Sequence, residues 1–277
     1  MPELPEVETV RRALLPHLIG RRMLDVTAQV PKLRRPLNIA ALRAACAGRR
    51  IRDLRRRGKY LVADLDGPDA LLLHLGMTGA FVIRPDGQPP DRHQRVEWRL
   101  DDGQLWRFLD PRMFGLVEVC QPAAPDGWPD ALTEMGPEPL SPEFDGRIFQ
   151  RLTRGRACPV KHLLLDQHAV AGIGNIYASE ACHRARIRPA RPAATLTRPE
   201  CNRLATSVKQ IMEAAIRCGG TTINDFRSVD GSEGKFTASL EVYGRTGEPC
   251  HRCGAPHRVR REVSGGRASF FCPHCQK

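Results

Sequence analysis

The stretch YLVADLDGPDALLLHLGMTGAFVI, residues 60–83, sets the architecture of the first half of the chain. Its short apolar runs are separated by turn residues, which is typical of β-strands. Two further runs, VEWRL (96–100) and QLWRFL (104–109), are joined by Asp-Asp-Gly at 101–103, a sequence that favours a tight hairpin turn. Several short antiparallel strands in succession predict a β-sandwich.

A helix is expected to precede these strands. Val7, Val10, Leu14 and Leu18 recur at spacings of three and four, so they share one helix face. Pro5 falls in the first turn, where its missing N–H costs little, and acids there suit the positive end of the helix dipole. Taken one by one, Glu3, Glu6 and Glu8 are ordinary helix-start residues. Glu8 is expected on the helix surface.

The second half of the chain is predicted to be helical. A capping box, Thr-Arg-Pro-Glu, occupies 197–200, and apolar residues at helical spacing follow it until Gly219-Gly220. Before it, six prolines with little periodicity between 121 and 143 indicate a linker. The fold class expected is therefore α+β with two domains. The predicted limits are a β-sandwich over 1–130, a proline-rich linker over 131–150, a helical domain over 151–240 and a separate C-terminal module over 241–277.

The C-terminal module carries a metal-binding pattern. Cys250 and Cys253 form one C-x-x-C knuckle, and Cys272 and Cys275 form another after eighteen intervening residues. This spacing matches structural zinc sites with four thiolate ligands. Disulfides are the alternative, but the other six cysteines are scattered singly, as in proteins with reduced thiols. Three nearby histidines could also bind the metal, namely His251, His257 and His274. Four cysteines explain the spacing without them.

The composition favours an anionic partner. Lys and Arg number 43 against 31 Asp and Glu, a formal net charge of +12. Such an excess indicates nucleic acid first and an anionic membrane surface second. No run reaches the roughly 20 apolar residues of a membrane span, and the N-terminus has no signal-peptide pattern. We therefore expect no membrane association and a cytoplasmic location. Basic residues concentrate in RRIRDLRRRGKY (49–60) and around the two knuckles.

Seven motifs occur in one order along the chain: MPELPEVETV, RRRGKYL, LHLGMTG, DPRMFG, AGIGNIYASE, TTINDF…VYGR and the four-cysteine finger. Together they closely resemble formamidopyrimidine-DNA glycosylase, the bacterial enzyme that excises oxidised purines, over nearly the whole chain. The resemblance implies a helix–two-turn–helix domain before a zinc-finger β-hairpin. It also implies a monomeric base-excision-repair glycosylase and AP lyase, with one structural Zn²⁺, that works near the bacterial nucleoid. Its partner would be double-stranded DNA carrying 8-oxoguanine, formamidopyrimidines or abasic sites.

The resemblance also implies catalytic roles. Pro2, freed by removal of Met1, would attack the sugar C1′ and form an iminium that stays cationic because it has no N–H to lose. Glu3 would transfer protons, with Lys59 as proton donor in β-elimination and Arg267 in δ-elimination. Glu6 matches the same motif and would have a structural or orienting role. The helix dipole and neighbouring cations would lower the pKa of the Pro2 amine.

Further residues are matched to the family's DNA contacts. A base inside a duplex must be extruded before it can react, and the gap must be filled. The resemblance implies that Met77, Arg112 and Phe114 fill it, whereas Met113 stands where a basic residue is expected. Phosphate contacts would come from His74, Gly174, Asn175 and Arg267. A loop over 228–234 would cover the extruded base.

Two alternatives remain open on the sequence. One is an endonuclease VIII-like glycosylase for oxidised pyrimidines, which would share Pro2 and Glu3. The other, from a different class, is a non-catalytic zinc-ribbon DNA-binding protein. That reading explains the charge and the finger but leaves the PELPE start and Lys59 unexplained.

Overall fold

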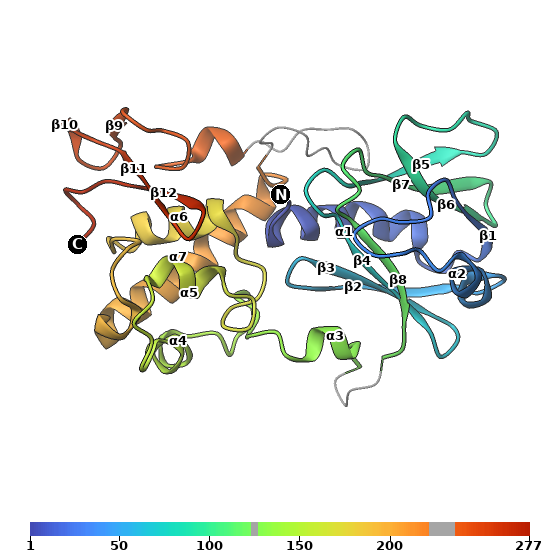
Figure 1. Cartoon of the computed structure of the whole chain (residues 1–277), viewed down its shortest axis with the longest axis horizontal. Coiled ribbons are helices and arrows are strands. Elements are labelled where there is room, and N and C mark those ends of the chain that lie inside the picture. The colour runs from blue at the N-terminus through green and yellow to red at the C-terminus, as the bar shows by residue number, and fades with distance from the viewer. Residues whose placement is uncertain (123–126, 222–235) are drawn as a thin grey trace. The chain divides into compact units, whose positions relative to one another are not determined.

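The computed structural model describes residues 1–122, 127–221 and 236–277, which form two compact units. Unit 1 contains Met1–Glu134 together with 218–221, and unit 2 contains Met135–Arg217 and Phe236–Lys277. The change of unit at Glu134 falls inside the segment predicted as a linker. Both units can be followed in Figure 1 by the colour ramp.

Unit 1 begins with helix α1 (Leu4–Leu18) and is otherwise built mainly of strands. One four-stranded antiparallel sheet has the order β1 (Met23–Ala28), β6 (Gln94–Leu100), β7 (Gln104–Leu109) and β5 (Ala80–Pro85). The other has the order β2 (Ile51–Arg57), β3 (Tyr60–Leu65), β4 (Ala70–His74) and β8 (Leu116–Cys120). The described part of the unit also contains two short helices, α2 (Ile39–Cys46) and α3 (Asp130–Thr133).

One hydrophobic core joins both sheets and α1. The helix contributes the four residues predicted for its buried face, and each is at most 1 % exposed. From the first sheet come Trp98 and Trp106, whose rings stack 4.3 Å apart, and from the second come Leu61 and Leu73. The predicted β-sandwich with an N-terminal helix is therefore confirmed. The hairpin of β6 and β7 turns where it was expected, with Gly103 at φ +76°.

Unit 2 is helical at first and ends in short strands. Its helices are α4 (Gly146–Thr153), α5 (Val160–Leu165), α6 (Asn175–Arg184) and α7 (Arg198–Arg217), with single 3₁₀ turns η1 (Ala193–Thr195) and η2 (Phe236–Ser239). The strands form two antiparallel pairs, β9 (Pro249–Cys250) with β10 (Gly254–Arg258), and β11 (Arg260–Ser264) with β12 (Arg267–Phe271). Helices α6 and α7 pack together, as do α4 and α7.

The predicted capping sequence begins α7. The Glu200 carboxylate accepts hydrogen bonds from Thr197 N–H (2.8 Å) and from the Thr197 hydroxyl (2.9 Å). The apolar face of the helix is buried as its spacing predicts. After Arg217 the chain passes through two glycines with positive φ, Gly219 and Gly220, which is how helices commonly end.

Candidate active site and DNA-contacting residues

The start of α1 is held by the carboxylate of Glu6. Its Oε2 accepts a hydrogen bond from Glu3 N–H (2.8 Å), and its Oε1 accepts both the N–H and the hydroxyl of Thr221 (2.8 Å each). Pro2, Glu3 and Glu6 are all buried. Glu6 therefore ties the backbone that follows Pro2 to a residue 215 positions later in the chain.

Met1 decides whether Pro2 can react. Its side chain is about half exposed. While Met1 remains attached, the Pro2 nitrogen belongs to a peptide bond and is not a nucleophile. Only removal of Met1 would give the secondary amine that the resemblance requires.

Glu8 does not lie on the helix surface as expected. It is 6 % exposed and pairs with Arg11 (2.9 Å), Arg12 (2.8 Å) and Arg56 (3.1 Å). The expectation was wrong because Arg56 comes from β2, and helix periodicity cannot show that a strand supplies a cation. This network fixes α1 against β2, the strand that leads into the turn containing Lys59.

Lys59 and His74 lie near each other in unit 1 and are both buried. Lys59 is in the turn between β2 and β3, and His74 ends β4 with its ring 4.7 Å from Tyr60. Burial, and then the positive charges of Arg34 and Lys59, lower the pKa of His74 to about 4. The neutral ring accepts Gly76 N–H at Nδ1 (2.8 Å), so Nε2 carries the proton and is the nitrogen able to donate to a phosphate.

The two loops predicted to fill the gap in DNA are joined by Asp110, which has no exposed surface. Its carboxylate accepts the Thr78 hydroxyl (2.8 Å), Gly115 N–H (2.7 Å) and Arg112 N–H (3.3 Å). Thr78 follows Met77 in one loop, and the other two donors flank Phe114. Asp110 thus holds the LGMTG and DPRMFG segments against each other, a role that no sequence pattern indicates.

The same loops approach closely at Gly76. A Cβ on Gly76 would lie 2.5 Å from the carbonyl carbon of Phe114, and its φ of +66° also favours glycine. Met77 (41 % exposed), Met113 (41 %) and Phe114 (45 %) are not core residues. The Arg112 guanidinium carbon lies 4.9 Å from the centre of the Phe114 ring. The loops therefore present an apolar tip with one cation beside it.

In unit 2, the turn between α5 and α6 is braced by Gln167. Its amide nitrogen donates to the carbonyls of Leu165 (3.0 Å) and Ile173 (2.9 Å), and its oxygen accepts Gly172 N–H (2.9 Å). Gly174 then precedes α6 as its N-cap, and Asn175 is the first residue of the helix. The Asn175 side-chain oxygen is buried without a hydrogen-bond partner among the described residues. A helix N-terminus of this kind suits a phosphate.

Arg267 stands at the tip of the β11–β12 hairpin, immediately after the turn Gly265-Gly266. Arg267 lines a small cavity of about 270 Å³ together with His162 and Leu165 of α5 and with Asp166, which follows that helix. Lys161 anchors the hairpin to α5 by donating to Ala268 O (2.6 Å) and to the Ser269 hydroxyl (3.0 Å). The hairpin is thereby fixed beside the helix–two-turn–helix segment.

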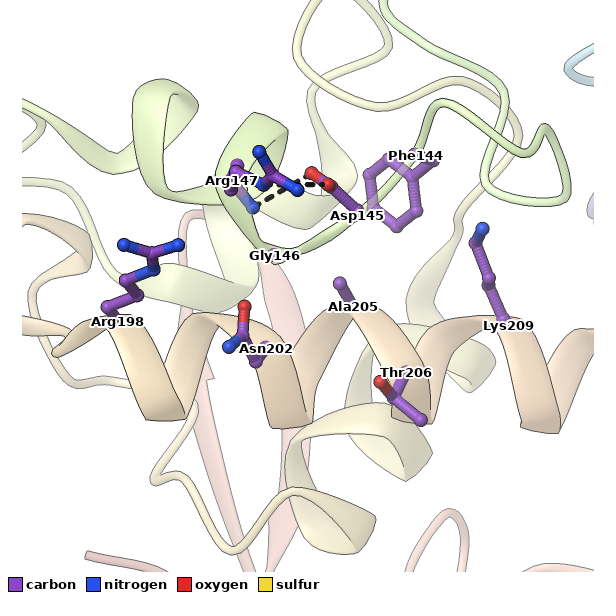
Figure 2. A pocket seen from close by; sticks show the side chains of 9 residues that line it. All are labelled: Phe144, Asp145, Gly146, Arg147, Arg198, Asn202, Ala205, Thr206 and Lys209. Atoms are coloured by element: carbon purple, nitrogen blue, oxygen red, sulfur yellow. Dashed lines mark hydrogen bonds and ion pairs between the residues drawn. The ribbon is translucent and has the colours of Figure 1, made fainter.

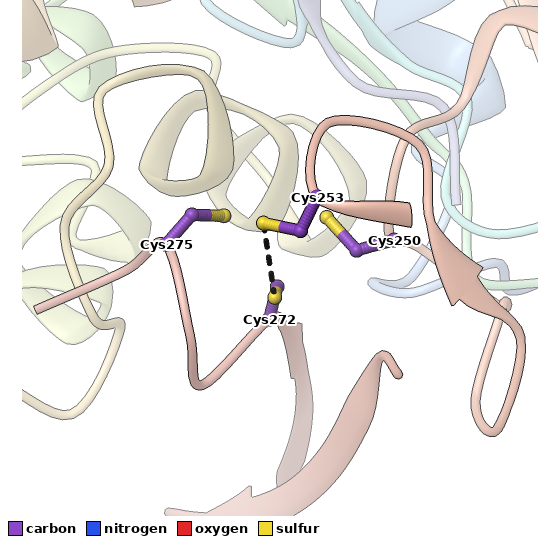
Figure 3. A group of neighbouring side chains, drawn as sticks. All are labelled: Cys250, Cys253, Cys272 and Cys275. Carbon is purple, nitrogen blue, oxygen red and sulfur yellow. Dashed lines mark hydrogen bonds between the residues drawn. The ribbon is translucent and has the colours of Figure 1, made fainter. Parts of the chain in front are cut away.

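The four predicted metal ligands come together. Figure 3 shows the sulfurs of Cys250, Cys253, Cys272 and Cys275 turned toward one another, and the ligand atoms all lie within 4.8 Å of one another. A tetrahedral zinc with Zn–S bonds of about 2.3 Å requires sulfurs roughly 3.8 Å apart. The Cys253–Cys272 separation of 4.0 Å fits this requirement. The finger is the site of one structural zinc ion, as predicted.

A basic groove of about 420 Å³ lies between α7 and the start of α4. In Figure 2, Arg198, Asn202 and Lys209 line the α7 wall, and Asp145 and Arg147 lie opposite them. Asp145 caps α4 by accepting the N–H groups of Arg147 and Ile148 (2.8 Å each). None of the residues predicted to act in catalysis or DNA binding lines this groove.

Comparison with known proteins matches each part of the chain to one family. Residues 1–117 match the N-terminal domain of formamidopyrimidine-DNA glycosylase, 135–227 match its H2TH domain, and 247–277 match the zinc finger found in FPG and IleRS. A formamidopyrimidine-DNA glycosylase of Cupriavidus pinatubonensis is 46 % identical, and one of Magnetococcus marinus is 42 % identical, each over the full length of both chains.

Solved structures agree with this match. The MutM (Fpg) protein from Thermus thermophilus is 42 % identical with a TM-score of 0.86, covering 99 % of this chain and 98 % of that one. A Lactococcus lactis Fpg mutant in complex with Fapy-dG-containing DNA is 34 % identical with a TM-score of 0.89, over the whole of both chains. The chain belongs to the formamidopyrimidine-DNA glycosylase family.

As a family member, the protein is a DNA glycosylase and AP lyase of base-excision repair. This excludes the non-catalytic zinc-ribbon alternative. The assignments of individual residues stay predictions, and the loop predicted at 228–234 lies outside the described residues. In the part of the chain that the structure covers, we find no helix with the length and hydropathy of a membrane span.

Proposed function

We propose that this glycosylase excises 8-oxoguanine and formamidopyrimidines from duplex DNA and then cleaves the strand, acting as a monomer through Pro2. The observation that carries the proposal is the buried start of α1, where Glu6 fixes the backbone next to Pro2 and Glu3 lies beside it. A crystal structure of a Lactococcus lactis Fpg mutant with Fapy-dG-containing DNA and a structure of MutM with carbocyclic 8-oxo-G-containing DNA support the choice of lesions. We expect the enzyme to act in the cytoplasm, at the nucleoid.

The proposed reaction begins after Met1 is removed. The Pro2 nitrogen attacks C1′ of the damaged nucleotide, the glycosidic bond breaks, and the base leaves with a proton. Glu3 protonates the ring oxygen O4′, so the C1′–O4′ bond breaks, the sugar opens, and the nitrogen lone pair forms the C1′=N⁺ iminium. The iminium withdraws electrons and acidifies the C2′ hydrogen, so β-elimination expels the 3′ phosphate and δ-elimination expels the 5′ phosphate. Lys59 and Arg267 are the proposed proton donors for these two steps.

The DNA contacts follow from the loops and helix ends. Met77 and Phe114 would enter the stack at the extruded base, and Arg112 would hydrogen-bond the orphaned partner base. Their exposure and the brace at Asp110 support this assignment. His74, Gly174 and Asn175 would bind phosphates, His74 through its Nε2–H.

Borohydride trapping tests the proposal. Zinc-loaded protein, shown by mass spectrometry to lack Met1, is incubated with a duplex containing 8-oxoguanine opposite cytosine, and sodium borohydride is added. We expect a covalent protein–DNA adduct. Pro2→Gly should lose most of the excision activity, and Glu3→Gln should bind the lesion duplex without cutting it. A processed, zinc-loaded enzyme that gives no adduct would overturn the mechanism.

The lesion class is tested separately. Cleavage of the 8-oxoguanine duplex is compared with that of a duplex carrying thymine glycol opposite adenine. We expect the purine lesion to be cut faster. Faster cleavage of thymine glycol would show that the enzyme has the endonuclease VIII-like specificity. It would leave the proposed Pro2 chemistry unaffected.

A further inference from the structure

His183, in the last turn of α6, is buried against the zinc finger although no sequence pattern marked it. His183 is 1 % exposed, and its Nε2 lies 3.6 Å from Cys250 Sγ. Cys250 is itself fully buried. A ring nitrogen at this distance from a sulfur ligand is in hydrogen-bonding range.

The chemistry of the ligand decides which nitrogen of His183 carries the proton. A zinc-bound cysteine is a thiolate, which can only accept a hydrogen bond. Nε2 must therefore be the donor. The other nitrogen, Nδ1, is buried and has no hydrogen-bond partner among the described residues. A neutral ring protonated at Nε2 leaves only a lone pair unsatisfied there, whereas the other tautomer would bury an unpaired N–H.

The same turn of α6 receives a second side chain from the finger. Arg252, between the first two cysteines, donates to His183 O (2.8 Å), and its Nη1 lies 3.9 Å from Cys275 Sγ. The second knuckle is also attached nearby, because Gln276 donates to Ile187 O (2.9 Å) and accepts Cys272 N–H (2.8 Å). Both knuckles are thus bound to the end of α6 and the residues that follow it.

We propose that His183 is a positioning residue of the zinc finger, donating its Nε2–H to the zinc-bound thiolate of Cys250. The site formed by Zn²⁺ and four thiolates carries a net charge of −2. A charge-assisted hydrogen bond from a buried donor therefore stabilises the zinc-loaded site. Because the donor belongs to α6, zinc binding also stabilises the last turn of the helix whose first residue is Asn175. The inference rests on the zinc site and not on the lesion specificity.

Two substitutions separate the hydrogen bond from packing. His183→Phe keeps an aromatic ring but removes the donor, and His183→Gln places an amide N–H at a similar reach. Zinc affinity of the full-length protein is measured by competition with a chromophoric chelator. Loss of a hydrogen-bonding partner of this kind typically weakens metal binding by about 10- to 100-fold. We expect that loss in His183→Phe, and affinity within roughly threefold of the parent in His183→Gln.

Cobalt substitution gives a readout that depends on the thiolates themselves. A thiolate that loses a hydrogen bond is more electron-rich, so the sulfur-to-cobalt charge-transfer band should move to lower energy in His183→Phe and stay in place in His183→Gln. His251→Phe is the matched control, because His251 adjoins Cys250 but is exposed and pairs with Glu241 (3.2 Å). It should change neither quantity. Parental affinity and spectrum in His183→Phe, or equal losses in both His183 variants, would overturn the proposal.

The unsubstituted protein supplies a test that does not depend on the variants folding. In ¹⁵N-histidine-labelled, zinc-loaded protein, long-range ¹H–¹⁵N correlations report which ring nitrogen of His183 is protonated. Protonation at Nε2 is required, and a ring protonated at Nδ1 alone would refute the assignment.

Discussion

Glu6 illustrates how much of the candidate site rests on one carboxylate. It is 2 % exposed, and among the described residues it accepts hydrogen bonds from Glu3 N–H and from the N–H and hydroxyl of Thr221. Both carboxylate oxygens of Glu6 accept hydrogen bonds, Oε2 from Glu3 and Oε1 from Thr221. The family resemblance implies a structural or orienting role for Glu6, and the contact with Thr221 gives it a specific structural task.

The substitution Glu6→Gln tests that task. The amide has one acceptor oxygen, and its NH₂ group would face a donor, which costs about 1–3 kcal/mol of stability. Because the backbone beside Pro2 would shift, we expect the single-turnover excision rate to fall by roughly tenfold or more. Denaturant titration and rapid-quench kinetics measure the two effects.

Thr221→Val is the matched control for Glu6→Gln. It removes the hydroxyl donor but keeps the Thr221 N–H bond, so its effects should be smaller, about 1 kcal/mol in stability. A Glu6→Gln enzyme with the parental single-turnover rate would show that Glu6 does not position Pro2.

The contact between α1 and β2 depends on Glu8 and gives a pH dependence with a definite sign. Burial by itself raises the pKa of Glu8, but hydrogen bonds from Arg11 and Arg12 and the charges of Arg11 and Arg56 lower it to about 2, against an ordinary value of 4.5. A carboxylate with a lowered folded-state pKa adds stability above its unfolded value. That stability is lost as the pH falls from 4.5 toward 2.

Glu8→Gln should therefore cost on the order of 2 kcal/mol in the free energy of unfolding near neutral pH. The fall in stability between pH 4.5 and 2 should also be shallower than in the parent. Urea titrations across this pH range measure both. Glu213→Gln is the control for a simple charge change, since Glu213 is exposed on α7. Identical pH profiles for parent and Glu8→Gln would contradict the role of this network.

Zinc removal tests whether the zinc finger unfolds independently of the sandwich in unit 1. The finger knuckles are attached to the end of α6 within unit 2, whereas the sandwich core of unit 1 contains neither zinc ligands nor finger residues. Because binding of a structural zinc is part of the folding free energy, chelation should unfold roughly the last thirty residues. We expect amide hydrogen exchange to accelerate over 249–277 and in the last turn of α6, with unchanged protection in β3, β4 and β7.

DNA binding provides the functional readout of the same experiment. The zinc-free protein should bind the lesion duplex more weakly because the hairpin that carries Arg267 unfolds with the finger. Addition of zinc should restore both binding and protection. Uniform loss of protection across both units would show that the two do not unfold separately.

Sequence patterns were reliable where local periodicity or fixed spacing decides the structure. The buried face of α1, the β6–β7 hairpin, the start of α7 and the four-cysteine cluster were all predicted, because helix period, turn chemistry and ligand geometry are local properties. Polar contacts between segments that lie far apart in the sequence leave no periodic or fixed-spacing pattern. Asp110 with Thr78, Glu8 with Arg56 and His183 with Cys250 are separated by 32, 48 and 67 residues.

The amino-acid sequence by itself therefore determined the α+β class, the zinc ligands and, through seven ordered motifs, the family. Only the tertiary structure decided which polar groups hold the predicted site residues in place, namely Glu6 beside Pro2 and Asp110 between the two exposed loops, and it brings His183 to the zinc ligand Cys250. The physical reason is that burial makes an unpaired polar group costly, so these residues act through the partners that folding brings to them. Those partners lie far away along the chain and follow no repeat.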